Sequence, residues 1–463
     1  MNTDSLLAQP VVAPRSPGFA TSSGKSLHPA SWLDESGVLL TKTDEQWVYR
    51  ALTAKGEEVL RHIQNQGGFG RLGQIGLIET EVVSDFGPIP GHPDLKTVIR
   101  HRRIAPVVFP MEWTMAMWQE ALAFLCRFHA GLLQHGLALS DAHAFNILFK
   151  SDGLPVFIDF GSLRVSGARF GVKRSWHREL RRDFLLPLLL HKLLCHKLAE
   201  TVTAEPANGM VKKYYRRSPL ALPLLWFDAT YEIARALGRP EMYLRRLESS
   251  LCCKTSAPEQ TNWTSYAATG EGWKGDFIRN LLPGLPDAHS VLDLAGNKGT
   301  YALYAARLGK NTLLADIDEA SLDQARATAR RDGIPLQVAR LDVCNPTAPR
   351  GLGLLRPGCY ERFRSDLVMA LAVSHHLAFR MQVPFHTFAG IITRFATRYI
   401  ITEFVGLGDE HVIKWLKKGR QPPRGYSDEQ FVHAFADMGW RVVKRDARPD
   451  GHRVLYLFER PSA

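Results

Sequence analysis

The C-terminal part of the chain alternates between short apolar runs and longer stretches in which apolar residues recur every three or four positions. The short runs predict strands, and the helical spacing predicts helices between them. We expect strands at 290–294, 311–315, 336–341, 367–372 and 399–404, helices at 301–308 and 321–331, and closing strands at 441–444 and 452–459. Strands that alternate with helices favour a parallel sheet covered on both faces, which is a doubly wound α/β fold.

The rest of the chain divides around two irregular segments. The helical pattern of 240–251 breaks at a Cys-Cys-Lys-Thr-Ser-Ala-Pro segment that begins at Cys252, and a new element begins near Trp273. The first thirty residues carry prolines among Ser, Thr and Gly without a periodic apolar face. We therefore expect a disordered segment at 1–30, one domain at 31–255 and a second at 256–463, in line with a length that exceeds one ordinary core.

The charge and the cysteine content limit the binding partners and the cellular compartment that the chain is expected to have. The net charge of +12 includes basic clusters such as Lys173-Arg174 and Arg181-Arg182, but a solvated surface also explains them, so nucleic acid binding is possible and not indicated. The six cysteines show no CxxC spacing, which argues against a zinc site and a disulfide framework. No secretory signal is recognisable, and the most apolar stretch, 184–194, is too short to span a bilayer and predicts a buried helix. We expect a cytoplasmic protein.

A turn of small residues follows the first strand of the second domain. The chain there reads Asp293-Leu294-Ala295-Gly296-Asn297-Lys298-Gly299-Thr300, and such a turn lets a ligand approach the backbone at the carboxyl edge of the sheet. The second strand ends in Asp316, where such folds place an acceptor for ribose hydroxyls. With Gly296 as the first glycine, Lys298 takes the second position of a Gly-x-Gly-x-x-Gly motif, so the dinucleotide pattern fails.

These residues resemble the motifs of class I S-adenosylmethionine-dependent methyltransferases, whose first motif is Asp-x-Gly-x-Gly-x-Gly; Ala295 and Asn297 replace two of its glycines. Leu341-Asp342-Val343 looks like the third motif, whose Asp meets the adenine amino group, and 366–377 is similar to the fourth-strand block beside the transferred methyl group. The likeness covers about 261–460 and implies a Rossmann-like domain. Its implied S-adenosyl-L-methionine contacts are Asp293, Ala295, Gly296, Asn297, Gly299, Asp316 and Asp342.

Methyl transfer from a sulfonium mainly requires a positioned acceptor, so a general base is optional. His375 and His376 at the fourth strand end and Glu403 at the fifth are the candidates by position. Adjacent residues on a strand end point apart, and no Cys, Asp or Glu stands at ligand spacing, so we expect no metal. We favour a small-molecule acceptor because no nucleic-acid module accompanies the domain, while an RNA enzyme that uses the basic clusters is the alternative.

The first domain contains a second constellation. Two short apolar strands flank a turn between 147 and 158, which places Asn146 and Asp159 at the open end of a hairpin. Asp141, Asn146 and the Asp159-Phe160-Gly161 triplet match the catalytic-loop spacing of protein kinases and small-molecule phosphotransferases. The resemblance implies an α+β kinase-like domain, with Asp141 as the base and Asn146 and Asp159 as magnesium ligands.

Other positions depart from the kinase pattern. Leu139 takes the place of the catalytic-loop His, and Arg50, with Glu57 or Glu58 as its possible partner, takes the place of the nucleotide-binding Lys. No Gly-rich loop precedes the strand 47–52. We therefore expect a degenerate, catalytically silent domain, and a bifunctional phosphotransferase and methyltransferase is the alternative. The layout also resembles a bacterial family that includes rhizobial nodulation proteins.

Overall fold

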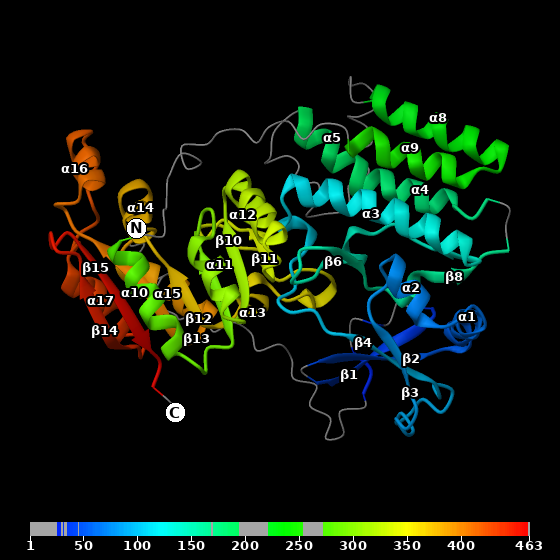
Figure 1. Ribbon diagram of the computed structural model, residues 1–463, viewed down its shortest axis with the longest axis horizontal. Coiled ribbons are helices and arrows are strands. Elements are labelled where there is room, and N and C mark those ends of the chain that lie inside the picture. The colour runs from blue at the N-terminus through cyan, green and yellow to red at the C-terminus, as the bar shows by residue number, and fades with distance from the viewer. Residues whose placement is uncertain are drawn as a thin grey trace, which may run out of the picture. The chain divides into compact units, whose positions relative to one another are not determined.

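The computed structural model describes residues 26–28, 31, 35–44, 46–167, 170–193, 221–252 and 272–461 (Figure 1). Most of the predicted disordered segment 1–30 and nearly all of the irregular segment after Cys252 therefore lie outside the described residues. The chain forms two compact units. The first comprises Met1–Gly70, Glu79–Arg103 and Pro349–Arg356, and the second comprises Arg71–Ile78, Ile104–Ala348 and Pro357–Ala463. The second unit thus contains residues from both predicted domains.

The first unit is built on an antiparallel sheet in the order β1-β2-β4-β3, with bounds β1 (Gly37–Thr43), β2 (Trp47–Leu52), β3 (Thr80–Val83) and β4 (Val98–Arg102). Helix α1 (Ala54–Asn65) follows β2, and the Thr53 side chain caps its first turn. Buried Trp47, Tyr49 and Val98 lie in the core of this unit. Helix α2 (Phe69–Ile75) follows α1 in the sequence, and its residues from Arg71 onward belong to the second unit.

The first part of the second unit is mainly helical. Its elements are α3 (Met115–Gln134), β5 (Leu137–Leu139), β6 (Ile147–Phe149), β7 (Pro155–Phe157), β8 (Leu163–Val165), α4 (Arg174–Leu180), the π-helix η6 (Arg181–Leu185), α5 (Leu186–Leu193), α8 (Ala221–Leu237) and α9 (Pro240–Cys252). Strands β6 and β7 form the predicted antiparallel hairpin, and Phe128 of α3 stacks on Phe157 of β7 with ring centroids 4.8 Å apart. The predicted buried helix at 184–194 corresponds to the end of η6 and to α5.

A seven-stranded sheet forms the remainder of the second unit. Its strands are β9 (Ser290–Leu294), β10 (Asn311–Asp316), β11 (Leu336–Arg340), β12 (Ser365–Ala370), β13 (Ala396–Val405), β14 (Arg441–Ala447) and β15 (Arg453–Glu459), in the order β11-β10-β9-β12-β13-β15-β14. Pairing is parallel from β11 to β13, and β15 is antiparallel to both of its neighbours. This Rossmann-like arrangement confirms the predicted strands, with shifts of up to three residues at their ends.

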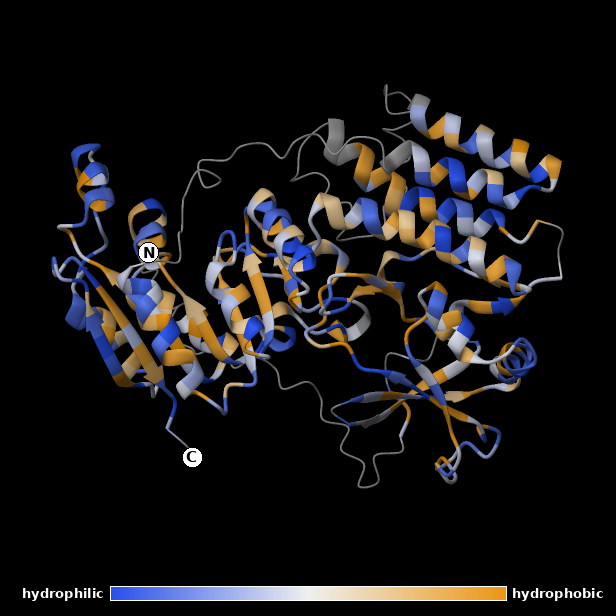
Figure 2. Ribbon diagram, in the orientation of Figure 1, coloured by the Kyte–Doolittle hydropathy of each residue, from blue (hydrophilic) through white to orange (hydrophobic). Residues whose placement is uncertain are grey.

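Helices cover both faces of this sheet. They are α10 (Trp273–Leu281), α11 (Thr300–Arg307), α12 (Glu319–Arg331), α13 (Cys359–Arg362), α14 (Ser374–Met381), α15 (Phe385–Phe395), α16 (Glu410–Lys417) and α17 (Asp428–Ala436). Phe277 of α10 packs in one core with Leu457 of β15, and Phe435 of α17 stacks on the next residue, Phe458. Because successive strand residues point to opposite faces, the sheet is covered on both sides, and Figure 2 shows its strands as predominantly hydrophobic.

The order in which the chain adds strands to the sheet changes direction at β9. From β9 the chain runs outward to β10 and β11 and then returns to β12 on the other side of β9. A reversal of this kind opens a crevice at the carboxyl ends of the strands, where ligands bind in doubly wound folds. No helix among the described residues is long and apolar enough to cross a membrane.

Candidate functional site

The turn after β9 has an unusual backbone. Ala295, Asn297 and Gly299 have φ values of 57°, 51° and 68°, so three residues within five adopt the left-handed region. Glycine reaches this region without strain, whereas Ala295 does so at a cost that the surrounding structure must offset. The turn stands at the carboxyl edge beside the crevice, and strained backbone of this kind clusters at ligand sites.

The end of β10 holds this turn in place. The Asn297 amide donates a hydrogen bond to Asp316 Oδ2 at 2.7 Å, and the Asp318 amide donates to Asp316 Oδ1 at 2.8 Å. Burial raises the pKa of Asp316, while these amide hydrogen bonds act in the opposite direction. The structure therefore brings the predicted turn and the predicted acidic residue together.

Asp293 lies beneath the turn. Its carboxylate is 2% exposed and accepts a hydrogen bond from the Ala302 amide at 3.2 Å, and burial raises its pKa to about 7. A Cβ atom at Gly296 would lie 2.5 Å from the Asp293 carboxylate and 2.6 Å from the Leu314 side chain. Only glycine fits at position 296, so Asp293 and Leu314 set the close path of the backbone.

Asp342 follows the end of β11 at the same edge of the sheet. Its side chain is partly buried, and its Oδ1 accepts a hydrogen bond from the Cys344 amide at 2.9 Å. The carboxylate thus forms an Asx turn and keeps a second oxygen for a ligand group. Sequence reasoning passed over Ile317, which directly follows Asp316 and leaves 54% of its surface exposed.

The two candidate histidines lie in a helix, which corrects the expectation that they end a strand and point apart. Strand β12 ends at Ala370, and His375 and His376 belong to the first turn of α14. Their ring centroids are 4.3 Å apart, and both rings contact Trp415 of α16. The described residues offer no group of three metal-ligating side chains, at these histidines or elsewhere.

The surroundings keep both histidines neutral. Burial, with positive charge on neighbours that include Arg453 and His411, lowers the pKa of His375 well below its usual range. Burial and the positive charge of Arg380 lower the pKa of His376 to about 3. His375 is 2% exposed, and His376 is partly exposed.

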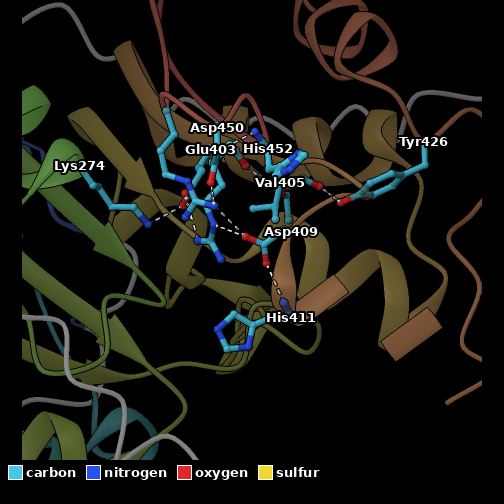
Figure 3. Close-up of polar contacts among 11 residues, drawn as sticks. Lys274, Glu403, Val405, Asp409, His411, Tyr426, Asp450 and His452 are labelled. Atoms are coloured by element: carbon cyan, nitrogen blue, oxygen red, sulfur yellow. Dashed lines mark hydrogen bonds and ion pairs between the residues drawn. The ribbon is translucent and has the colours of Figure 1, made fainter. Parts of the chain in front are cut away.

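Glu403 belongs to a buried charge network (Figure 3). Its side chain is fully buried, and it pairs with Lys274 at 2.6 Å and with Arg453 at 3.3 Å. Arg453 Nε also donates to Asp409 Oδ2 at 2.7 Å. Sequence reasoning missed Lys274, Arg453 and Asp409, because they lie on α10, β15 and the loop after β13 and no local motif connects them.

The kinase-like constellation also comes together. Asn146 Nδ2 donates to Asp141 Oδ1 at 2.7 Å, and Asp159 Oδ1 accepts from the Gly161 amide at 3.0 Å. Burial and the negative charges of Asp159 and Glu179 raise the pKa of Asp141 to about 6.

In the first unit, the positions that depart from the kinase pattern are now placed. Arg50 lies on β2 and is largely buried, with 6% of its surface exposed. Glu57 of α1, one of its two possible partners, accepts a hydrogen bond from the Thr97 hydroxyl at 2.6 Å.

No protein-family model matches the chain. A curated relative, the nodulation protein NoeA of Rhizobium meliloti (strain 1021), is 28% identical over 442 residues, which cover 88% of this chain and 89% of the relative. The similarity therefore extends through both predicted domains.

Several solved structures are also similar to part of the chain. Magnesium protoporphyrin IX methyltransferase from Synechocystis PCC 6803 with bound SAH is 14% identical and covers 41% of this chain and 84% of its own, with a TM-score of 0.30. An S-adenosylmethionine-dependent methyltransferase from Clostridium acetobutylicum ATCC 824 is 11% identical over 42% of this chain and 94% of its own, with a TM-score of 0.31. WbdD, described as a bifunctional kinase-methyltransferase, is 19% identical over 40% of this chain and 37% of its own, with a TM-score of 0.29.

Proposed function

We propose that the chain is an S-adenosylmethionine-dependent methyltransferase that acts on a small-molecule acceptor. The observation that carries the proposal is the left-handed turn from Ala295 to Gly299, hydrogen-bonded to Asp316 at the switch point of a doubly wound sheet. A phosphate-free ligand requires this kind of close, turned backbone and does not require the glycine pattern of dinucleotide sites.

The residues present fit S-adenosylmethionine. Asp293 and Leu314 fill the space that a Cβ atom at Gly296 would need, so the backbone at this position carries no side chain. The methionine portion of the cofactor would lie against this bare backbone. Asp316 would bind the ribose hydroxyls, Asp342 the adenine amino group, and Asp293 would support the turn from below. The cofactor supplies an electrophilic methyl group on a sulfonium, and the protein holds the acceptor in line with it.

The proton of the acceptor is the second task of the site. His376 is partly exposed, but its pKa of about 3 makes its imidazole a weak base, so we propose that the site acts mainly by positioning the acceptor, with His376 beside it. His375 is deeply buried beside it and would orient the acceptor side of the site. For Glu403 we propose a structural role, because two cations already bind its carboxylate in the interior.

We propose the class of the methyl acceptor from the charge and architecture of the described residues. The sheet and its covering helices carry no additional nucleic-acid module in the described part of the chain, which favours a small molecule. An RNA acceptor held by the basic clusters is the competing proposal, and retention of RNA that weakens steeply with salt would support it. Because the chain is similar to a nodulation protein over most of its length, we also propose a role in nodulation.

For the N-terminal half we propose a non-catalytic, kinase-like module. Asp141, Asn146 and Asp159 are held together and could still bind magnesium, but Arg50 stands in the place of the nucleotide-binding Lys and no Gly-rich loop precedes β2. A bifunctional phosphotransferase is the alternative. ATP hydrolysis by the full chain that Asp159→Ala abolishes would support that alternative over the silent module.

Calorimetric titration with S-adenosylhomocysteine tests the cofactor site. We expect the full chain to bind, and Asp316→Ala to weaken binding by about 1–3 kcal/mol, because charge-assisted hydrogen bonds to the ribose are lost. Asp332→Ala, at an exposed carboxylate after α12 that pairs with Arg331, is the matched control and should bind like the wild type. Equal affinities for Asp316→Ala and the wild type would contradict this assignment of the ribose site.

A further inference from the structure

The helix that follows Asp316 determines where its carboxylate points. Asp318 is the N-cap of α12: its side chain accepts hydrogen bonds from the Ala320 amide at 3.3 Å and from the Ser321 hydroxyl at 2.8 Å. The backbone amide of the same Asp318 donates to Asp316 Oδ1 at 2.8 Å. A shift of the first turn of α12 would therefore move the Asp316 carboxylate and, through the Asn297 amide, the turn after β9.

Residues far away in the sequence hold this first turn. The N-terminus of α3 meets α12, where the Met115 amide donates to Glu319 Oε2 at 2.9 Å and the Thr114 hydroxyl donates to Asp323 Oδ1 at 2.6 Å. Thr114 is fully buried and is itself the N-cap of α3. The Glu319 carboxylate thus lies at the positive end of α3, where negative charge is stabilised.

A second set of contacts holds the other end of α12. Glu120 of α3 pairs with Arg326 and Arg330, both at 2.6 Å. The Gly153 carbonyl, in the turn between β6 and β7, accepts hydrogen bonds from the same two arginines. On the neighbouring strand β11, Gln337 Nε2 donates to the Phe149 carbonyl at 2.8 Å.

The chemistry of these contacts differs from that of a simple packing surface. Asp323 and Arg326 lose much of their hydration here, and burial raises the pKa of Asp323 to about 6 and lowers that of Arg326. Apolar residues of similar volume could pack two elements together without this cost of desolvation. Directional hydrogen bonds at both ends of α12 fix the position of the helix along its own axis. Apolar contacts restrict such a shift less.

We propose that Thr114 and Glu120 are positioning residues for the cofactor: the helical part of the N-terminal half holds α12 so that Asp316 and the turn after β9 keep the geometry that binds S-adenosylmethionine. This inference rests on the proposed methyltransferase function and gives the N-terminal half its role in it. The methyltransferase site is completed by contacts that lie outside the Rossmann-like sheet.

The test is the affinity of the full chain for S-adenosylhomocysteine, measured well below the unfolding temperature so that a loss of stability does not enter. Thr114→Val removes the hydroxyl that binds Asp323 and should weaken binding by about 3- to 10-fold, the range for one lost hydrogen bond. Thr114→Ser keeps the hydroxyl and should restore wild-type affinity. A role in stability alone would not produce this difference in affinity.

A matched control separates positioning from general damage. Arg362 of α13 contacts the N-terminal half at Glu112 and does not belong to the contacts described above that hold α12, so Arg362→Lys should lower stability and leave the affinity unchanged. Wild-type affinity of Thr114→Val would overturn the positioning role, while absence of binding by the wild type would instead contradict the proposed function. If Thr114→Val does not fold, Asp323→Ala leaves the cap of α3 intact and takes its place, and unchanged affinity of that variant overturns the proposal.

Discussion

Replacing Arg362 by Ala is expected to lower the free energy of unfolding by about 3–5 kcal/mol, the cost of leaving a buried charge without its partner. Both partners of this pair are inside the protein: Glu112 is fully buried, and the Arg362 side chain is 4% exposed. Arg362 Nη1 also donates to the Val107 carbonyl at 2.6 Å, and its guanidinium lies 4.2 Å from the centre of the Phe109 ring.

Denaturant unfolding of the full chain, followed through the first transition, measures this effect. Arg398→Ala, which removes an exposed ion pair with Asp287, is the control and should change stability by less than about 1 kcal/mol. The double substitution Arg362→Met with Glu112→Leu should recover most of the loss, because an apolar pair needs no compensation for buried charge. A loss for Arg362→Ala no larger than for Arg398→Ala would contradict the buried pair.

The second large effect concerns pH and Asp293. Burial raises the pKa of this carboxyl from an ordinary 3.8 to about 7, so the folded state binds its proton more tightly than the unfolded state does. Its contribution to stability is therefore complete below about pH 4 and is lost as the pH rises to about 7. Between pH 5 and pH 8, the loss amounts to about 2–3 kcal/mol.

Asp293→Asn should remove this part of the pH dependence, because the amide keeps an acceptor for the Ala302 amide and does not titrate in this range. Asp141 and Asp323 also have raised pKa values and act in the same pH window, so the measured quantity is the difference between the wild type and Asp293→Asn at each pH. The variant should gain stability relative to the wild type as the pH rises from 5 to 8. Parallel pH profiles would show that Asp293 is charged in the folded protein throughout.

Much of the fold could be predicted because local patterns determine it. The parallel strands β9 to β13 are largely buried apolar runs, and the stretches between them have helical periodicity, so both signals are strong in the sequence. The turn after β9 was predictable for a related reason, since Gly296 and Gly299 come shortly after a buried strand. The left-handed conformation of Ala295 was not, because alanine gives no signal for it.

The remaining parts of the site depend on contacts between distant residues. Glu403 meets Lys274 across 129 positions of the chain, and Thr114 meets Asp323 across 209 positions, so no local spacing reveals either pair. His375 was assigned to a strand end because the apolar run of β12 continues into Leu371 and Ala372. In the structure, Ala372 has a φ of 52°, in the left-handed region. The chain turns there, and α14 begins at Ser374.

The central claim is methyl transfer, and it is tested most directly by incubating the purified full chain with methyl-labelled S-adenosylmethionine and a metabolite extract from cells that lack the protein. We predict that label enters a small molecule, and that Asp316→Ala slows this transfer while Asp332→Ala does not. Label that enters RNA in a parallel incubation with total RNA from the same cells would favour the competing acceptor. No transfer to any acceptor in the extract, together with no binding of S-adenosylhomocysteine by the intact chain, would contradict the account.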